Sequence, residues 1–391
     1  MAKFNEFGIN EELTLPVDIA TELLRSKPEA VFGYRGKQGA INCIALVIKA
    51  FLNEIALGYA TRIDISVKDK TIRLISDNRG MNITNENRIK ARFFNPGFAF
   101  LLSPYSECFD ENPVGERNGF LFSNCSESRE PFNTDEFERT SEAMFLLNCV
   151  TKYIKVSSVI NGKRYNYRTE YGKPNGFETT LTGKPKISGT MLEFEFSEDV
   201  FENIDVNAED IIPILETAAV VYPKAVFSIN TTGGSFHICY NEGIKSRLEE
   251  IAQGCTTRPS FWKQSEWVKE DGKSFSVQLK ISFCISGEEK SIRECYHNGM
   301  RLRFCEYEEA IVQAAGKIIR ADESLPAELR NNVEKHLCFV ADSMSVNTQW
   351  KNKDRTEMDG EALAKLAESM MCCKLPNYLK ENKAAIDELL G

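Results

Sequence analysis

Histidine is scarce in this sequence, and the few histidines present are poorly placed to bind a metal. The chain contains three, His237, His297 and His336, and no two of them are four residues apart. Zinc sites usually draw on histidine and cysteine ligands at short spacings. The sequence also has no Cys-x-x-Cys pair, although it contains 12 cysteines. We therefore expect no metal site built from protein ligands.

The cysteines are not arranged as a disulfide framework either. They are spread from Cys43 to Cys373 in a chain of 391 residues, and Cys372 and Cys373 are adjacent. Disulfide frameworks are typical of short secreted chains with closely spaced cysteines. We expect reduced thiols and a cytoplasmic location, in a bacterium or in the host cell of a phage.

Long apolar runs and an excess of positive charge are also lacking. Residues 1–16 include acidic side chains and no apolar core of the signal-peptide kind, and no run of about 18 apolar residues occurs anywhere. We expect a protein that is neither exported nor inserted in a membrane. The 48 Lys and Arg residues are outnumbered by 57 Asp and Glu, which gives a formal charge of −9. Because phosphate backbones are attracted to basic surfaces, direct DNA binding is not expected.

What the sequence does contain is the composition of a folded chain with more than one domain. Hydrophobic residues make up 42% and charged residues 27%, and there are 25 phenylalanines, which is enough apolar material for ordinary cores. Single cores stop growing at about 250 to 300 residues. A chain of 391 residues therefore predicts two or three domains.

The first half of the chain combines helical and strand patterns. Residues 42–57 are apolar on nearly every face, which predicts a helix buried on most of its surface. Alternating apolar residues predict a β-hairpin over 62–75 and further strands between 153 and 196. Over about 78–140 the pattern is lost, which predicts a long lid loop. This order predicts an α+β domain over 1–210, with helices on one face of a mixed sheet.

A second α+β domain is predicted over residues 211–391. Its last stretch, 360–390, has one apolar stripe and predicts a helix that is broken at Pro376, because proline lacks the N–H group and clashes with the preceding turn. The other elements predicted for this domain are strands over 225–230, 236–240, 275–286 and 336–341 and helices over 307–319 and 326–335.

Several short segments stand in an order that resembles a known family. Together they resemble the ATPase region of type IIA DNA topoisomerases, the gyrase-B-type member of the Bergerat-fold (GHKL) ATPases. One stretch, 215–230, is similar in particular to the ATPase subunits of T-even phage topoisomerases. The segments that carry the resemblance are 25–33 (RSKPEAVFG), 53–59 (NEIALGY), 77–81 (DNRGM), 189–190 (GT), 218–223 (AAVVYP) and 349–351 (QWK).

The resemblance implies a Bergerat-type (GHKL) ATPase-like domain followed by a transducer-like domain. In that family one helix carries a Glu, the general base, and four residues later an Asn that holds magnesium. An ungapped match on the segment 53–59 places Leu46 at the base position and Ala50 at the metal position. Neither side chain has a proton acceptor or a metal ligand. The resemblance therefore implies a site without catalytic residues.

The nucleotide-binding positions are changed in part. Ser76 stands where the family's Asp accepts the adenine amino proton, and Arg79, Gly80 and Thr190 match residues of the adenine side. Residues 141–143, Ser-Glu-Ala, replace the family's Gly-Val-Gly beside the phosphates. Glycine there would allow close backbone approach, and a carboxylate would repel phosphate.

On the transducer side, Gln349 and Lys351 match the family's Gln-Thr-Lys loop, whose lysine reaches the γ-phosphate. Each retained residue also has a purely structural interpretation. Gly80 fits a turn, Thr190 fits a strand, and Lys351 fits a solvated polar segment.

These positions imply a catalytically degenerate paralogue of a topoisomerase ATPase subunit, which binds protein and does not hydrolyse ATP. The expected partner is a topoisomerase subunit or a second copy of the chain, as a homodimer, and no cofactor is expected. Two alternatives stay open. Under the first, a diverged ATPase-subunit fragment binds and hydrolyses Mg-ATP with an acid elsewhere as the base. Under the second, the fold is a scaffold unrelated to DNA topology.

Overall fold

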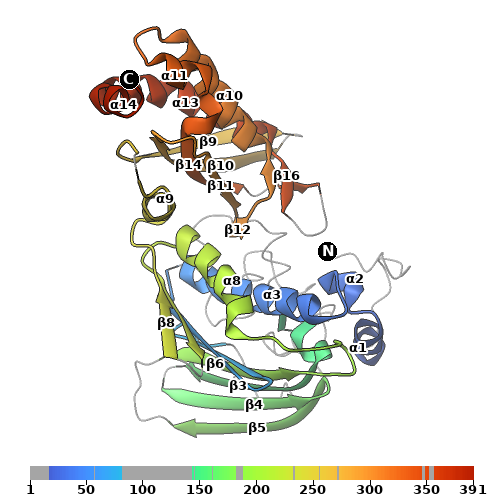
Figure 1. Cartoon of the computed structure of the whole chain (residues 1–391). Helices are drawn as coiled ribbons and strands as arrows, with labels where there is room; N and C mark the ends of the chain where they lie inside the picture. The colour runs from blue at the N-terminus through green and yellow to red at the C-terminus, as the bar shows by residue number, and fades with distance from the viewer. Residues whose placement is uncertain are drawn as a thin grey trace. The chain divides into compact units, whose positions relative to one another are not determined.

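The structure is a computed structural model (Figure 1). The predicted lid lies, from residue 82 onward, outside the described residues, as do Ser141 and Glu142. The structure describes residues 17–56, 58–81, 143–144, 146–160, 162–181, 188–231, 234–254, 256–270, 273–345, 348–351 and 356–391.

Two compact units make up the described chain. The first contains the described residues up to Glu216 together with Ala225–Cys239, and the second contains Thr217–Lys224 together with Tyr240–Gly391. The chain therefore passes from one unit to the other more than once between residues 216 and 240.

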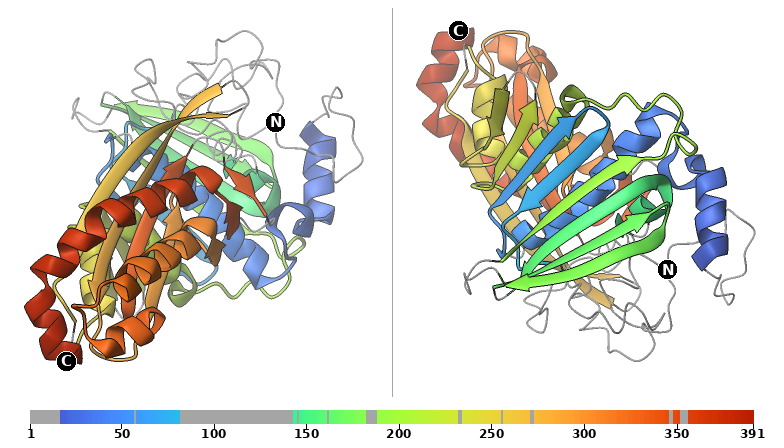
Figure 2. Two further views of the ribbon diagram at one scale, coloured as in Figure 1. Left: turned by 90° about the horizontal axis from the view of Figure 1, so that it is seen from above. Right: turned by 90° about the horizontal axis from the view of Figure 1, so that it is seen from below.

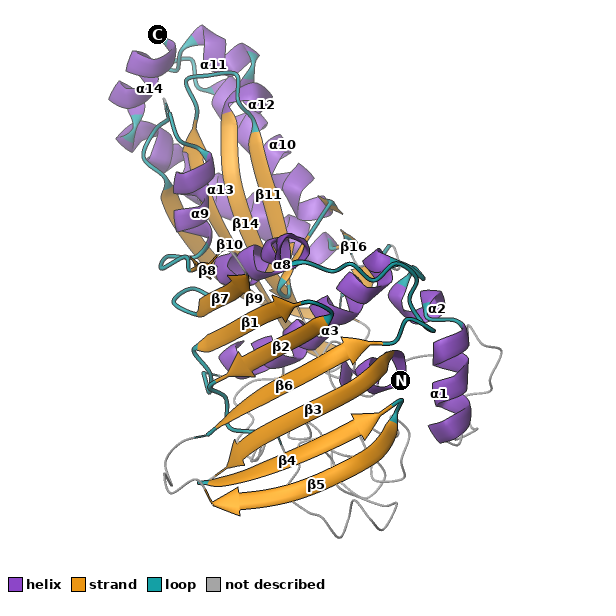
Figure 3. Ribbon diagram, turned by 60° about the horizontal axis from the view of Figure 1, so that its bottom comes forward, coloured by secondary structure: helices purple, strands orange, loops and turns teal. Residues whose placement is uncertain are grey.

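The first unit is built on one eight-stranded sheet of order β5-β4-β3-β6-β2-β1-β7-β8 (Figure 3). Neighbouring strands are antiparallel except β1 and β7, which are parallel, so the sheet is mixed as predicted. The predicted hairpin over 62–75 is confirmed, with Val67 opposite Ile72. The strands are β1 Arg62–Lys68, β2 Thr71–Ser76, β3 Thr151–Ile160, β4 Lys163–Glu170, β5 Lys173–Leu181, β6 Gly189–Phe196, β7 Val226–Thr231 and β8 Gly234–Ile238.

Two long helices, α3 (Lys37–Ala56) and α8 (Ala208–Val221), lie on one face of this sheet (Figures 1 and 2). Two shorter helices, α1 (Val17–Ser26) and α2 (Glu29–Phe32), precede α3. Residues 143–144 and 146–150 are also helical. The prediction of helices on one face of a mixed sheet is confirmed in the described part of this unit.

Helix α3 is the buried helix that the apolar pattern predicts. Its 20 residues and mean hydropathy of 1.5 make it long and apolar enough to cross a membrane by length and composition alone, and 56% of the apolar window is buried inside the fold. Ile44, Val47, Ile48 and Phe51 are buried. The central helix of a folded domain has the same properties, because it is covered on most sides.

Strands β7 and β8 lie elsewhere than the sequence suggests. They were predicted as the first strands of the second domain, but β7 pairs with β1, with Ile63 opposite Phe227. Phe227 and Ile229 are fully buried in the first unit's sheet. Periodicity shows that a segment is a strand but not which sheet accepts it, since any open edge offers the same hydrogen bonds.

The second unit contains a five-stranded sheet of order β12-β11-β14-β10-β9 and a small sheet of order β13-β16-β15. Its strands are β9 Ser260–Glu270, β10 Lys273–Ile285, β11 Ile292–His297, β12 Met300–Arg301, β13 Phe304–Cys305, β14 Leu337–Ser345, β15 Gln349–Trp350 and β16 Glu357–Asp359. Its helices are α9 Ile244–Ile251, α10 Glu306–Ala321, α11 Ala327–Asn331, α12 Val333–His336, α13 Glu361–Glu381 and α14 Lys383–Leu390.

Helices cover both faces of the five-stranded sheet. On one face, Phe283 and Phe339 belong to a large core with residues of α10 and α13. On the other, Cys284, Cys338 and Leu248 of α9 form a smaller core. Adjacent residues of one strand reach different cores because side chains alternate between the faces of a sheet.

The predicted break at Pro376 is wrong. Helix α13 continues through this proline to Glu381, and the chain bends only at Asn382. Proline removes the hydrogen bond to the carbonyl four residues earlier, which is that of Cys372. Cys372 and Pro376 are both exposed, so water can solvate that carbonyl, while Leu375 on the buried side keeps the helix packed.

Candidate functional site

The candidate site begins on α3, where Leu46 and Ala50 share one face because they are four residues apart. Leu46 is half-buried and Ala50 is buried. One turn before Leu46, the Asn42 amide donates from Nδ2 to the Phe32 carbonyl at 2.8 Å and accepts from Gln38 Nε2 at 2.9 Å. The face that carries Leu46 and Ala50 therefore has no carboxylate at either position, and the neighbouring amide is engaged.

Glu54 is the single acidic residue of α3, and it forms a buried ion pair with Arg79. Arg79 Nε donates to Glu54 Oε2 at 3.0 Å, and Nη2 donates to Oε1. The Glu54 side chain is 1% exposed and that of Arg79 is 14% exposed. The guanidinium also lies over the Tyr59 ring, 3.7 Å from its centre. Both carboxylate oxygens of Glu54 are thus occupied by an always-charged partner.

The turn after β2 is organised by the buried side chain of Asn78. Asn78 Oδ1 accepts a hydrogen bond from Gly80 N at 2.9 Å and another from Thr190 Oγ1 at 2.9 Å. Thr190 Oγ1 in turn accepts from Met81 N at 3.0 Å, and Ser158 Oγ donates to the Met81 carbonyl at 2.7 Å. One amide oxygen therefore holds the turn and the start of β6 together.

Two buried polar atoms, one at the end of β2 and one in this turn, have no hydrogen-bond partner among the described residues. They are Ser76 Oγ and Asn78 Nδ2, and both residues are at most 3% exposed. A buried donor or acceptor without a partner costs about 1 to 3 kcal/mol. The hydrogen-bonding groups of Ser76 and Asn78 are therefore only partly paired within the described residues.

Ser76 and Asp77 face opposite ways, as expected for neighbours at the end of a strand. Ser76 is buried, whereas Asp77 is exposed. Asp77 Oδ1 accepts from the backbone N–H groups of Thr61 and Arg62, both at 2.9 Å, and Oδ2 accepts from Thr61 Oγ1 at 2.6 Å. The carboxylate of Asp77 thus caps the start of β1 and does not replace an acid at Ser76.

Gly80 is required by the backbone. Its φ is +89°, and a Cβ atom there would lie 2.6 Å from the Val159 carbonyl oxygen and 2.6 Å from Ile160 Cγ1. Only glycine fits so close an approach at a positive φ. The close packing of the backbone at this turn is therefore enough to explain why position 80 is a glycine, without a role in nucleotide binding.

Comparison with known proteins shows which fold positions these residues. No protein-family model matches the chain. The B subunit of the type 2 topoisomerase of Aquifex aeolicus (strain VF5) is 18% identical over 94% of this chain and 45% of that protein, so the chain spans less than half the length of this curated relative.

Among solved structures, the 43K ATPase domain of Thermus thermophilus gyrase B, in complex with an aminocoumarin, aligns with a TM-score of 0.69 at 15% identity, over 95% of this chain and 92% of that chain. This chain has the gyrase-B-type fold. The B-subunit of Myxococcus xanthus DNA gyrase aligns with a TM-score of 0.67 at 15% identity, over 95% and 98%. The topoisomerase IV ATP-binding domain of Francisella tularensis, in complex with a small-molecule inhibitor, aligns with a TM-score of 0.65 at 14% identity, over 94% of each chain.

The fold class predicted from sequence is therefore confirmed. A GHKL-type layer followed by a transducer-like unit is the architecture of the gyrase-B-type fold. The nucleotide roles implied for Ser76, Arg79, Gly80 and Thr190 stay predictions. In the described structure, Ser76 ends β2, Arg79 and Gly80 lie in the turn after it, and Thr190 lies at the start of β6.

In the transducer-like unit of this gyrase-B-type fold, Lys351 lies beside two acidic residues. Lys351 Nζ lies 2.6 Å from Asp359 Oδ1 and 3.5 Å from Glu306 Oε1. The hydrogen bond to Asp359 raises the pKa of Lys351, and the charges of both acids act in the same direction. Gln349 begins β15, and its side chain lies outside the described part of the chain.

Sequence reasoning missed two features of the site. Asn78 stands where the family's Asp-Gly-Arg-Gly turn has its first glycine, and this exchange was a visible signal. The pairing of Glu54 with Arg79 had no such signal, because the two residues are separated by 25 positions and belong to different elements.

Proposed function

We propose that this chain is a catalytically degenerate paralogue of a type IIA topoisomerase ATPase subunit that binds a protein partner and does not hydrolyse ATP. The observation that carries the proposal is that Leu46 and Ala50 of α3 offer neither a proton acceptor nor a metal ligand at the two positions that the resemblance assigns to catalysis. Losing a general base lowers a rate by about 10² to 10⁴. Ala50 has no amide or carboxylate, so the protein would also lack a ligand at this position for the magnesium ion that neutralises a bound triphosphate.

The residues on the adenine side do not suit Mg-ATP either. Asn78 Oδ1 already accepts from Gly80 N and Thr190 Oγ1, two groups that the resemblance assigns to the nucleotide side. Ser76 offers a hydroxyl where the family has a carboxylate, and such an exchange costs about 1 to 3 kcal/mol of binding free energy. The Asn78 side-chain amide thus competes with an adenine ring for the Gly80 N–H and Thr190 hydroxyl donors.

The alternative of an active ATPase needs another acid near Leu46. On α3 the single candidate is Glu54, and Arg79 occupies both of its carboxylate oxygens. Removing Glu54 from this pair to act as a base would leave a buried guanidinium uncompensated, at a cost of several kcal/mol. This pairing favours the degenerate site over the active one.

Calorimetric titration with a magnesium complex of a non-hydrolysable ATP analogue tests the proposal, together with a phosphate-release assay. We expect neither heat of binding at micromolar concentrations nor phosphate release. Micromolar binding to the chain would refute the proposal. Lys351→Ala separates the two hypotheses further, since it lowers turnover if the transducer lysine serves hydrolysis and changes nothing if the site is inactive. The gyrase B ATPase domain of Thermus thermophilus serves as the positive control.

Protein binding needs an exposed surface with apolar content, and β9 supplies one. The side chains of Phe261 and Trp267 on this strand are 45% and 71% exposed, and Lys263 and Lys269 are exposed on the same face. Among the described strands, β9 is also an edge strand of its sheet, and such an edge can pair with a partner strand. Large aromatic side chains beside positive charge suit a partner that is both apolar and acidic.

The proposed partner is a topoisomerase subunit or a second copy of this acidic chain, in the cytoplasm. Pull-down from a producing cell tests the first, and light scattering with and without nucleotide tests the second. Recovery of topoisomerase subunits or a stable dimer supports the proposal. Consistent absence of both favours a scaffold unrelated to DNA topology.

A further inference from the structure

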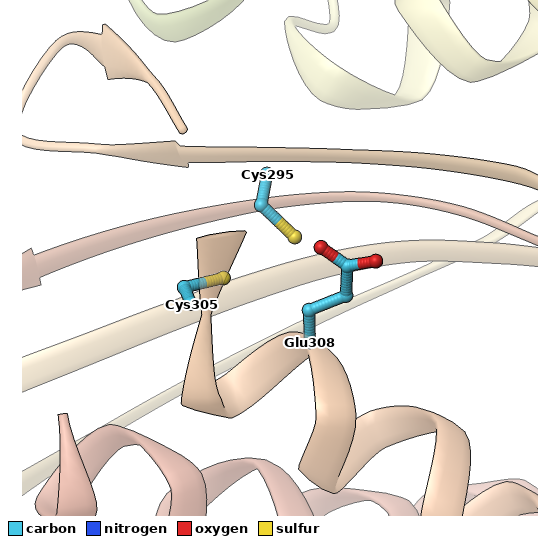
Figure 4. A group of neighbouring side chains, drawn as sticks. All are labelled: Cys295, Cys305 and Glu308. Carbon is cyan, nitrogen blue, oxygen red and sulfur yellow. The ribbon is translucent and has the colours of Figure 1, made fainter. Parts of the chain in front are cut away.

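Two buried cysteines and one glutamate converge in the second unit. Cys295 and Cys305 are buried, and Glu308 is half-buried. The two Sγ atoms and one carboxylate oxygen of Glu308 all lie within 4.8 Å of one another. Figure 4 shows the three side chains pointing into one small space between a strand and the start of a helix.

Separate elements hold these three side chains in place. Cys295 lies on β11, opposite Ala341 of β14, and its carbonyl accepts from Leu302 N at 2.8 Å. Cys305 is the residue that caps the N-terminus of α10, and its thiol makes no capping hydrogen bond. Glu308 follows in the first turn of α10. The backbone around the cluster is therefore fixed by hydrogen bonds that do not use the ligand atoms.

We propose that Cys295, Cys305 and Glu308 bind one Zn²⁺ ion. Two thiolates and a carboxylate are a ligand set that zinc accepts, and the soft sulfur ligands disfavour Mg²⁺ and Ca²⁺. With Zn–S bonds of about 2.3 Å, two thiolates on a tetrahedral ion are about 3.8 Å apart. The 4.8 Å limit on the present ligand atoms means that side-chain shifts of about 1 Å close the site.

The surroundings of the cluster suit a bound cation with anionic ligands. The N-terminal end of α10 carries a partial positive charge, which favours anionic ligands on a bound ion. Two thiolates and one carboxylate carry three negative charges against the two positive charges of zinc. Arg293, two residues before Cys295 on β11, adds positive charge on the same strand.

Three protein ligands leave a fourth position on a tetrahedral ion. Glu308 is half-buried, so water can reach the site and supply the fourth ligand. Binding breaks two S–H bonds and releases two protons to solvent. The ion would join β11 to α10 and stabilise the folded state. The Cys-x₉-Cys-x₂-Glu spacing is unlike the short pairs of common zinc motifs, which is why the sequence predicted no metal site.

Cobalt substitution tests this site on the full chain, purified with reductant and stripped with chelator. Titration with Co²⁺ should produce the visible bands of a tetrahedral ion and thiolate-to-cobalt charge transfer, saturating at one ion per chain and reversed by Zn²⁺. Cys305→Ser and Glu308→Gln should each weaken binding by on the order of tenfold or more. Cys373→Ser, at an exposed cysteine of α13, should leave the spectrum unchanged.

If Cys305→Ser does not fold, the comparison of the wild-type chain with Glu308→Gln still tests the proposal. Glu308→Gln is expected to fold because Glu308 is half-buried and glutamine has nearly the same volume. Circular dichroism establishes that each variant is folded. The proposal is overturned if the wild-type chain shows no tetrahedral thiolate spectrum. It is also overturned if folded Glu308→Gln binds as tightly as wild type, or if mass spectrometry finds Cys295 and Cys305 joined as a disulfide.

Discussion

Asn78 joins two segments that are 112 residues apart in the sequence, through its hydrogen bond with Thr190. The family resemblance places a glycine at this position, which has no side chain to make such a bond. The asparagine therefore replaces an open turn with an internal link. The result is a turn in which the Gly80 N–H and the Thr190 hydroxyl donate to a side chain of the same chain.

Asn78→Ala should lower the free energy of unfolding by about 1 to 3 kcal/mol, because Gly80 N and Thr190 Oγ1 lose their buried acceptor. Chemical denaturation measures this change. Asn377→Ala, at an exposed position of α13, is the matched control and should stay within about 0.5 kcal/mol of wild type. Equal stability of the two variants would contradict the role assigned to Asn78.

Between elements, a buried carboxylate ties α9 to β11 and β12. Glu294 Oε2 accepts from Arg247 Nε at 3.0 Å, and Oε1 accepts from Arg247 Nη2 at 3.1 Å and from Arg301 Nη2 at 2.8 Å. Burial raises the pKa of Glu294, but the hydrogen bonds and charge of Arg247, together with the charge of Arg301, outweigh it and leave the pKa lowered.

Because the folded-state pKa of Glu294 is lowered, its contribution to stability is fully present above the unfolded pKa of about 4.3 and is lost as pH falls through the folded pKa. Glu294→Gln should therefore reduce stability near pH 7 and flatten the acid limb of the stability curve below about pH 4. Denaturation at a series of pH values measures both. Glu266→Gln, at an exposed residue of β9, should leave the acid limb unchanged. A Glu294→Gln curve parallel to wild type throughout would refute this account.

Helix α13 offers a test at the level of one element. Pro376→Ala restores an N–H group that can bond the Cys372 carbonyl, and it removes the clash with the preceding turn. We expect the free energy of unfolding to rise by about 1 to 3 kcal/mol, as measured by denaturant titration. No gain would show that the helix has bent to absorb the proline without cost.

For the molecule as a whole, binding to a partner should depend on the outward face of β9. The double variant Phe261→Ala with Trp267→Ala should reduce partner recovery, or self-association in light scattering, by at least about tenfold, because exposed aromatics dominate many interfaces. The melting temperature should hardly change, since both side chains are exposed. Phe236→Ala, at an exposed position of β8, is the control. Competition by a single-stranded oligonucleotide would instead indicate nucleic-acid stacking on this face.

Much of the secondary structure was predictable because helices and strands follow from the local spacing of apolar residues. The hairpin of β1 and β2 follows from alternation over 62–75, and α3 follows from an apolar helical pattern. The sheet that accepts β7 was not predictable, since a strand pattern does not name its neighbour. The continuation of α13 was not predictable either, because the cost of Pro376 depends on which side of the helix faces water.

By itself, the sequence determined that the chain forms α+β units, because helix and strand patterns follow from local spacing, and it put side chains without a proton acceptor at positions 46 and 50. Only the tertiary structure decided that Arg79 occupies Glu54 and that Asn78 bonds to Thr190. It alone also brought Cys295 and Glu308 together. Such contacts join separate elements, and chain folding creates them without any periodic trace in the sequence.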